Sequence, residues 1–76
     1  MELRQLRYFL AVARHGSVTA AAEQLGRTQQ AVSKSLQQLE ERLGVRLFDR
    51  ANGPVRLTAF GEMLVEHART ADDALR

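Results

Sequence analysis

The segment from residue 21 to residue 40 constrains the fold more than any other part of this chain. Its sequence, AAEQLGRTQQAVSKSLQQLE, starts with small and apolar residues, passes through Gly26 and then enters an apolar repeat. That repeat has the spacing of one helix face and consists of Val32, Leu36, Leu39 and Leu43. The segment therefore predicts two helices joined by a tight glycine turn, which is the outline of a helix-turn-helix.

The face of the second helix opposite this repeat is polar and suits a DNA groove. We expect the helix to cover residues 28–43, with Thr28 as its N-cap. Glutamine can pair with adenine, lysine with guanine or phosphate, and serine with several bases. The candidate DNA-binding residues here are Thr28, Gln29, Gln30, Ser33, Lys34 and Gln37. The alternative for such a face is simple solvation of a surface helix.

The flanking elements complete a small helical domain. A first amphipathic helix is predicted by Leu3, Leu6, Phe9, Leu10 and Ala13, and we expect it to end near Gly16. Ser17 can cap a second helix, whose alanines at 20–22 allow close approach to the next helix.

Residues 45–58 predict a two-stranded hairpin. Two short β-prone runs, 45–50 and 55–58, flank the dipeptide Asn52-Gly53, which favours a tight turn. A helix-turn-helix followed by a hairpin is a winged helix, so we predict a mainly α fold of three helices and a two-stranded wing over residues 1–58. The wing carries three cations suited to the phosphate backbone, Arg46, Arg50 and Arg56.

A final long helix is expected over residues 59–76, with Thr58 as its cap. Its apolar stripe is too long for so small a core, so we predict that it packs against the same helix of a second subunit. The candidate interface residues are Phe60, Leu64, His67, Ala68, Ala71 and Leu75. The alternative is a helix folded back on its own domain.

Composition excludes several classes of protein. The 76 residues allow one small domain. There is no cysteine, and His15 and His67 lack a metal-ligand spacing, so we expect no metal and no cofactor. No nucleophile with a base and no carboxylate pair stands at a useful spacing, so we predict no enzyme. No segment resembles a signal peptide or membrane span, which favours a cytoplasmic protein.

The net charge of +2 is small, but it is unevenly distributed. No Asp or Glu occurs from Gln24 to Leu39, whereas four acids crowd the C-terminal segment, Glu62, Glu66, Asp72 and Asp73. One surface can therefore face phosphates while another avoids them.

Three stretches together resemble the N-terminal domain of LysR-type transcriptional regulators: SVTAAAEQL, TQQAVSKSLQQLEERLGVRLFDR and VRLTAFGEML. The resemblance implies a homodimer that forms through the linker helix and binds a partly palindromic promoter site with T and A flanks. It also implies that the residue at Arg4 approaches the DNA backbone and that Arg50 contacts phosphate. Members of the family carry a C-terminal domain for a small-molecule co-inducer, and we expect that domain to be absent from this stretch.

Three positions depart from the family pattern. Gln30 stands where proline is common, which adds a side chain that can contact a base. Arg27 occupies a turn position that is usually apolar, so we expect its stem to cover the core while its guanidinium reaches outward. Gly53 replaces a basic residue at the wing tip, so we expect that minor-groove contact to be missing.

A winged helix can also serve as a protein–protein interaction module. In that case the acid-free face would bind an acidic partner, and affinity for random duplex DNA would be negligible. The target promoter, the co-inducer and the sign of regulation do not follow from the sequence.

Overall fold

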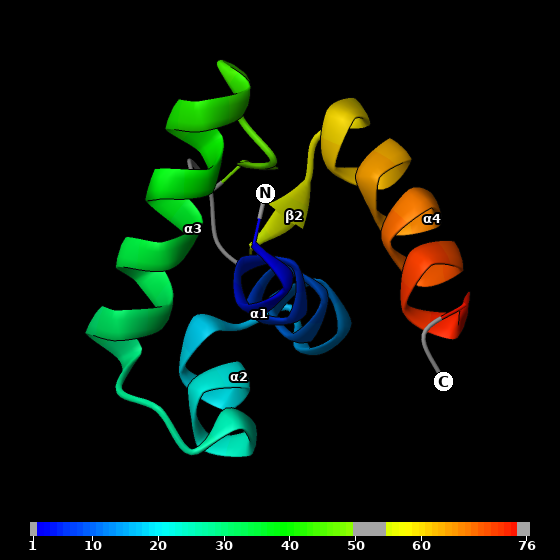
Figure 1. Ribbon diagram of the computed structural model, residues 1–76. Coiled ribbons are helices and arrows are strands. Elements are labelled where there is room, and N and C mark those ends of the chain that lie inside the picture. Colours follow the sequence, from blue (N-terminus) through cyan, green and yellow to red (C-terminus); the bar gives the residue numbers. More distant parts are fainter. Residues whose placement is uncertain (1, 50–54, 75–76) are drawn as a thin grey trace.

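The computed structural model describes residues 2–49 and 55–74, and the side chains of residues 2–49 and 55–70. Four helices and a two-stranded sheet follow one another along the chain: α1 (Leu3–His15), α2 (Val18–Leu25), α3 (Gln29–Leu43), β1 (Phe48–Asp49), β2 (Arg56–Leu57) and α4 (Ala59–Ala74). Figure 1 shows α1 at the centre, with α3 and α4 on opposite sides of it. This order confirms the predicted winged helix-turn-helix.

The N-terminal caps of α2, α3 and α4 form where the sequence predicted them. The hydroxyl oxygens of Ser17, Thr28 and Thr58 each accept a hydrogen bond, at 3.1 Å, from a backbone N–H three residues later. Gly26 adopts φ 67°, a left-handed conformation that costs glycine little, and it ends α2. The following Arg27 N–H donates to the Ala22 carbonyl oxygen at 3.0 Å, which closes the turn before α3.

The core forms around α1, which contacts α2, α3 and α4. Phe9 is fully buried, and its ring centroid lies 5.3 Å from that of Phe48 in β1. The predicted stripe of α3 is buried at three of its four positions, but Leu43 is 42% exposed, because it lies in the last turn of the helix. The hydrophobic contacts of Phe9 and Phe48 link the helical part of the domain to the wing.

The buried face of α1 is rotated from the predicted one. Leu3 is 42% exposed, whereas Gln5 and Tyr8 are buried together with Phe9 and Val12. Three helices pack on α1, so its buried face is set by their positions and not by the apolar spacing alone. The amphipathic helix is therefore confirmed, but Leu3, part of its predicted apolar face, lies at the edge of the buried face.

The wing is shorter than predicted. Its strands have two residues each and pair antiparallel, with Phe48 opposite Leu57 and Asp49 opposite Arg56. The Thr58 N–H donates to the Leu47 carbonyl oxygen at 3.0 Å, which ties the end of the hairpin to its beginning. The predicted turn at 51–54 and Arg50 lie outside the described residues.

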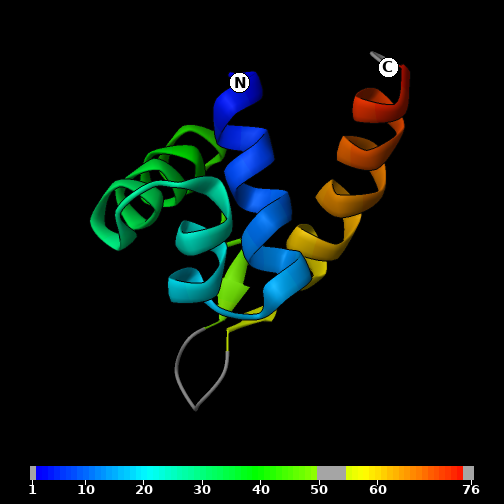
Figure 2. The same cartoon turned by 90° about the horizontal axis from the view of Figure 1, so that it is seen from below.

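Helix α4 rests on its own domain through its first turns and then extends beside α1 (Figure 2). Gly61 is buried at the contact, where an added Cβ would collide with the backbone carbonyl of Leu47. Ala68 is 2% exposed. Ala68, one residue of the stripe predicted for a second subunit, is therefore buried within this domain. No helix in the described parts of the chain is long and apolar enough to cross a membrane.

Candidate nucleic-acid interface

The N-terminal half of α3 presents a continuous polar surface to solvent. Gln29, Gln30, Lys34 and Gln37 are exposed, and Ser33 is half-buried. Within the described part of the chain, none of these five side chains forms a hydrogen bond or an ion pair. The structure thus brings together the residues that the sequence selected on this helix and leaves their polar groups available.

The usable length of this surface follows from helix geometry. Gln30, Lys34 and Gln37 lie along one line of the helix, and Glu41 follows on the same line one turn later. At 1.5 Å per residue, Gln30 and Gln37 are about 10 Å apart along the axis, or about three base-pair steps. The carboxylate of Glu41 would repel phosphates, so the surface suited to DNA ends before it.

The start of α3 favours an anion. Its first turn contains no acidic residue, and its first N–H groups lack partners within the helix. The Thr28 hydroxyl accepts the N–H of Ala31, which holds the helix start in place. The positive end of the helix dipole therefore faces the same side as Gln29 and Gln30.

Glu40 orients the wing, a role that the sequence analysis missed. Its Oε2 atom accepts the backbone N–H of Leu47 at 2.7 Å and that of Phe48 at 3.3 Å. The same oxygen lies 3.8 Å from Nε of Arg46. The only signal in the sequence was the position of this acid at the edge of the buried stripe, next to Leu39.

The cations of the wing are solvent-exposed. Arg46 has a side-chain exposure of 73%, and its carbonyl oxygen accepts the Thr58 hydroxyl at 2.6 Å. Arg56 in β2 is also exposed. These contacts fix the backbone of the wing next to α3 while both arginine side chains remain exposed to solvent.

Two shallow hollows lie on either side of α3. One, of about 550 Å³, includes Ser33, Gln37 and Arg46 on the side of the wing. The other, of about 730 Å³, includes Arg4 and Lys34 on the side of α1. Arg4, predicted to approach the DNA backbone, therefore lines the same hollow as Lys34 of α3.

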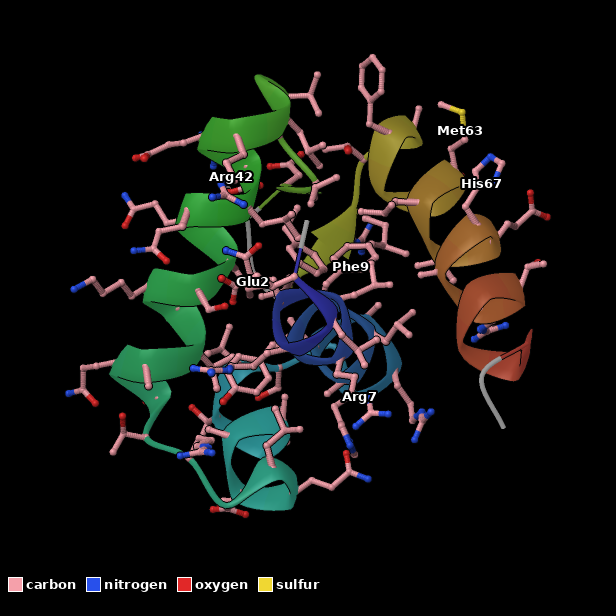
Figure 3. The ribbon with its side chains drawn as sticks, viewed as in Figure 1. Glu2, Arg7, Phe9, Arg42, Met63 and His67 are labelled. Carbon is pink, nitrogen blue, oxygen red and sulfur yellow. The ribbon has the colours of Figure 1, made fainter. Side chains whose placement is uncertain are left out.

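The predicted subunit interface divides into two faces of α4. Ala68 is buried against this domain, and Leu64 packs partly against the core. Phe60 is 53% exposed and lines an apolar groove with His67 and with Met63, which is 51% exposed. Met63 and His67 point away from the domain in Figure 3.

The same groove includes Leu43, the last residue of the apolar repeat that the sequence analysis identified in this helix. Neither Leu43 nor Met63 was predicted for the subunit interface, because the prediction included only one apolar stripe of α4. The side chain of Ala71 is not described, and Leu75 lies outside the described residues.

No group of three or more potential metal ligands occurs among the described residues.

The family model for bacterial regulatory helix-turn-helix proteins of the lysR family matches residues 3–62. The chain belongs to the LysR family. Its curated relatives have the names of transcriptional regulators and not of enzymes.

One LysR relative is the SDS degradation transcriptional activation protein of Pseudomonas sp. (strain ATCC 19151), with 50% identity over 99% of this chain. The match covers only 26% of that relative, so this chain spans about a quarter of the length of its curated relatives. The shared region therefore corresponds to one part of a longer regulator.

Solved LysR structures share the fold. The DNA-binding domain of BenM in complex with catB site 1 DNA superposes with a TM-score of 0.96 and 40% identity, covering 99% of this chain and 83% of that one. The CbnR DNA-binding domain in a DNA complex gives 0.93 and 41% identity, covering 99% of this chain and 86% of that one. The winged-helix fold and the family agree with the sequence analysis.

Proposed function

We propose that this domain binds double-stranded DNA sequence-specifically and thereby serves a bacterial transcription regulator. The observation that carries the proposal is the exposed, acid-free half of α3, whose polar side chains have no partners in the described chain. In this proposal α3 lies in the major groove. Gln29, Gln30 and Ser33 contact bases, while Lys34 and Gln37 contact bases or nearby phosphates.

The wing follows the phosphate backbone in this arrangement. The exposed side chains of Arg46 and Arg56 and the anchoring of the wing by Glu40 support this placement. Arg50, between them in the sequence, is the residue that we assign to a phosphate contact, as the family resemblance implies. The DNA complexes of BenM and CbnR support the general mode of binding.

The domain works as a homodimer through α4, and the contact is centred on the groove between α3 and α4. Three of the four large apolar residues exposed in the described chain line this groove, namely Leu43, Phe60 and Met63. Such a cluster marks an association surface. Residues 1–58 then form the DNA-binding unit, and 59–76 the linker that joins two copies on two-fold related half-sites.

Met63→Glu tests this dimer contact. The substitution places a charge in an apolar interface without disturbing the core, and we expect a folded monomer by light scattering with an unchanged circular dichroism spectrum. Arg69→Ala is the matched control, because it changes net charge equally on the opposite side of α4. A Met63→Glu protein that remains dimeric would move the interface elsewhere.

The curated relatives of this chain are longer regulators, and the family's C-terminal domain would supply the rest of the activity. A small-molecule co-inducer would bind the C-terminal domain that the family carries, and the promoter sets the site of action. Binding to chromosomal DNA places the protein in the bacterial cytoplasm.

A protein-interaction module is the competing function, and salt dependence separates the two. A domain that neutralises phosphates releases counterions, so log affinity for duplex DNA falls linearly with log salt by about 0.9 per phosphate. We expect a slope of several units for this chain, measured by fluorescence anisotropy. Negligible affinity for any duplex at low salt would favour the protein partner.

A further inference from the structure

The hollow between α1 and α3 contains cations, three of which lie outside the base-contacting face of α3. Four of them line it, Arg4, Arg27, Lys34 and Arg42, together with the carboxylates of Glu2 and Glu41. With four cations against two carboxylates, the lining of the hollow is net positive and favours an anion.

The floor of the hollow has an unused polar group. Gln5 is 7% exposed and lines the hollow, and its Oε1 atom has no hydrogen-bond partner in the described chain. A buried amide without a partner is unfavourable and calls for an explanation, such as a ligand that is bound there. Since a half-turn of the amide exchanges its two ends, Gln5 can offer either its oxygen or its N–H donors.

Arg27 is positioned at this hollow by the turn that precedes α3. Its backbone N–H is fixed by the Ala22 carbonyl oxygen, and its side chain is exposed. We propose that Arg27 and Arg4 hold a backbone phosphate of one DNA strand in this hollow, with the Gln5 amide beneath it. This inference rests on the proposed DNA-binding function and adds a phosphate site to it.

The geometry of a major groove favours DNA over an acidic peptide here. The groove is about 12 Å wide and a helix with its side chains is about 10–12 Å thick, so both DNA backbones lie close to the flanks of the helix. In this domain each flank of α3 has a hollow with an arginine, and Lys34 belongs both to the outer face and to the hollow of Arg27. One strand would follow the wing side and the other would follow α1.

The test compares Arg27→Ala and Arg4→Ala with Arg7→Ala. Arg7 is an exposed arginine of α1 outside the hollow and points away from α3 in Figure 3, so it controls for loss of one positive charge. Affinity for a random-sequence duplex is measured at several salt concentrations. We expect the double variant Arg27→Ala/Arg4→Ala to lower the salt slope by about 0.9 per bound protomer, or about 3.5-fold in affinity over a fourfold change in salt, each single variant to lower it by part of that amount, and Arg7→Ala to leave the slope unchanged.

A chemically modified duplex locates the contact. Single phosphates of a selected binding duplex are replaced by neutral methylphosphonates, one position at a time. We expect one position at which the replacement weakens the original chain but has no further effect on Arg27→Ala. A variant that merely disturbed the fold would lose affinity equally at all positions.

Unchanged salt slopes for both hollow variants would overturn the inference while leaving sequence-specific binding by α3 intact. Failure of the original chain to bind either duplex would instead overturn the proposed function itself. Loss of an acidic protein partner with no effect on DNA would assign the hollow to protein binding and also refute the phosphate site.

Discussion

The two halves of α3 differ in what their side chains contact. Gln29, Gln30 and Lys34, in the first half, are exposed and have no side-chain partners among the described residues. In the second half, Glu40 accepts two backbone N–H groups of the wing, and Leu43 lines the groove beside α4. One helix therefore presents a free surface at its start and organises the domain at its end.

This difference separates binding from stability along a single helix. Substitutions in the first half should alter DNA affinity with little effect on folding, since exposed positions without partners change stability by about 0.5 kcal/mol or less. Substitutions in the second half should lower the stability of the fold with little direct effect on DNA contacts. The following variants test this division of DNA binding and stability between the two halves of α3.

Glu40→Ala should have the largest effect. It removes a charged acceptor from the N–H groups of Leu47 and Phe48, and we expect the free energy of unfolding to fall by about 3 kcal/mol. Urea denaturation measures the loss, with the exposed neighbour Glu41→Ala as the control. Equal losses for the two variants would show that the contact of Glu40 with the wing contributes nothing specific.

Gln29→Ala tests the opposite end of the helix. We expect a loss of about 1 to 3 kcal/mol in binding to the preferred site and relaxed preference at one base position. Thermal unfolding should be unchanged. Equal losses on every DNA sequence would refute a base-contacting role, and a large loss of stability would break the separation between the two halves.

Gly61→Ala tests the contact between α4 and the segment that follows α3. Alanine normally stabilises a helix interior by about 1 kcal/mol relative to glycine, but here its Cβ would collide with the Leu47 carbonyl. Overpacking costs about 1 to 3 kcal/mol, so we expect a net destabilisation of about 1 kcal/mol in urea. A more stable variant would show that α4 can move away from the wing without cost.

The sequence predicted those features that depend on local chemistry. Ser17, Thr28 and Thr58 cap their helices as expected, and the glycine turn places the polar face of α3 outward. These signals act over three or four residues, so no knowledge of the packing was needed.

The errors concern features that depend on packing between elements. Leu3 and Leu43 satisfied the apolar spacing of their helices, but each is 42% exposed. Ala68 was assigned to a second subunit, although α4 already buries it against this domain. The role of Glu40 was not predicted, because its partners, the N–H groups of Leu47 and Phe48, come close to it only after the chain turns back from α3.

Several residues predicted to contact DNA or a second subunit stay predictions. Arg50 and Leu75 lie outside the described residues, and the side chain of Ala71 is not described. The DNA contacts assigned to Thr28, Gln30, Ser33, Lys34 and Gln37 concern a partner molecule, so their exposure supports the assignment without testing it.

Selection of bound duplexes from a random DNA pool tests the central claim most directly, with the selected sequences then measured at several salt concentrations. If α3 of two subunits contacts bases, the selected duplexes will share a two-fold related motif with T and A flanks, and affinity will fall steeply with salt. Recovery of no motif, together with binding that ignores sequence at every salt concentration, would contradict the claim.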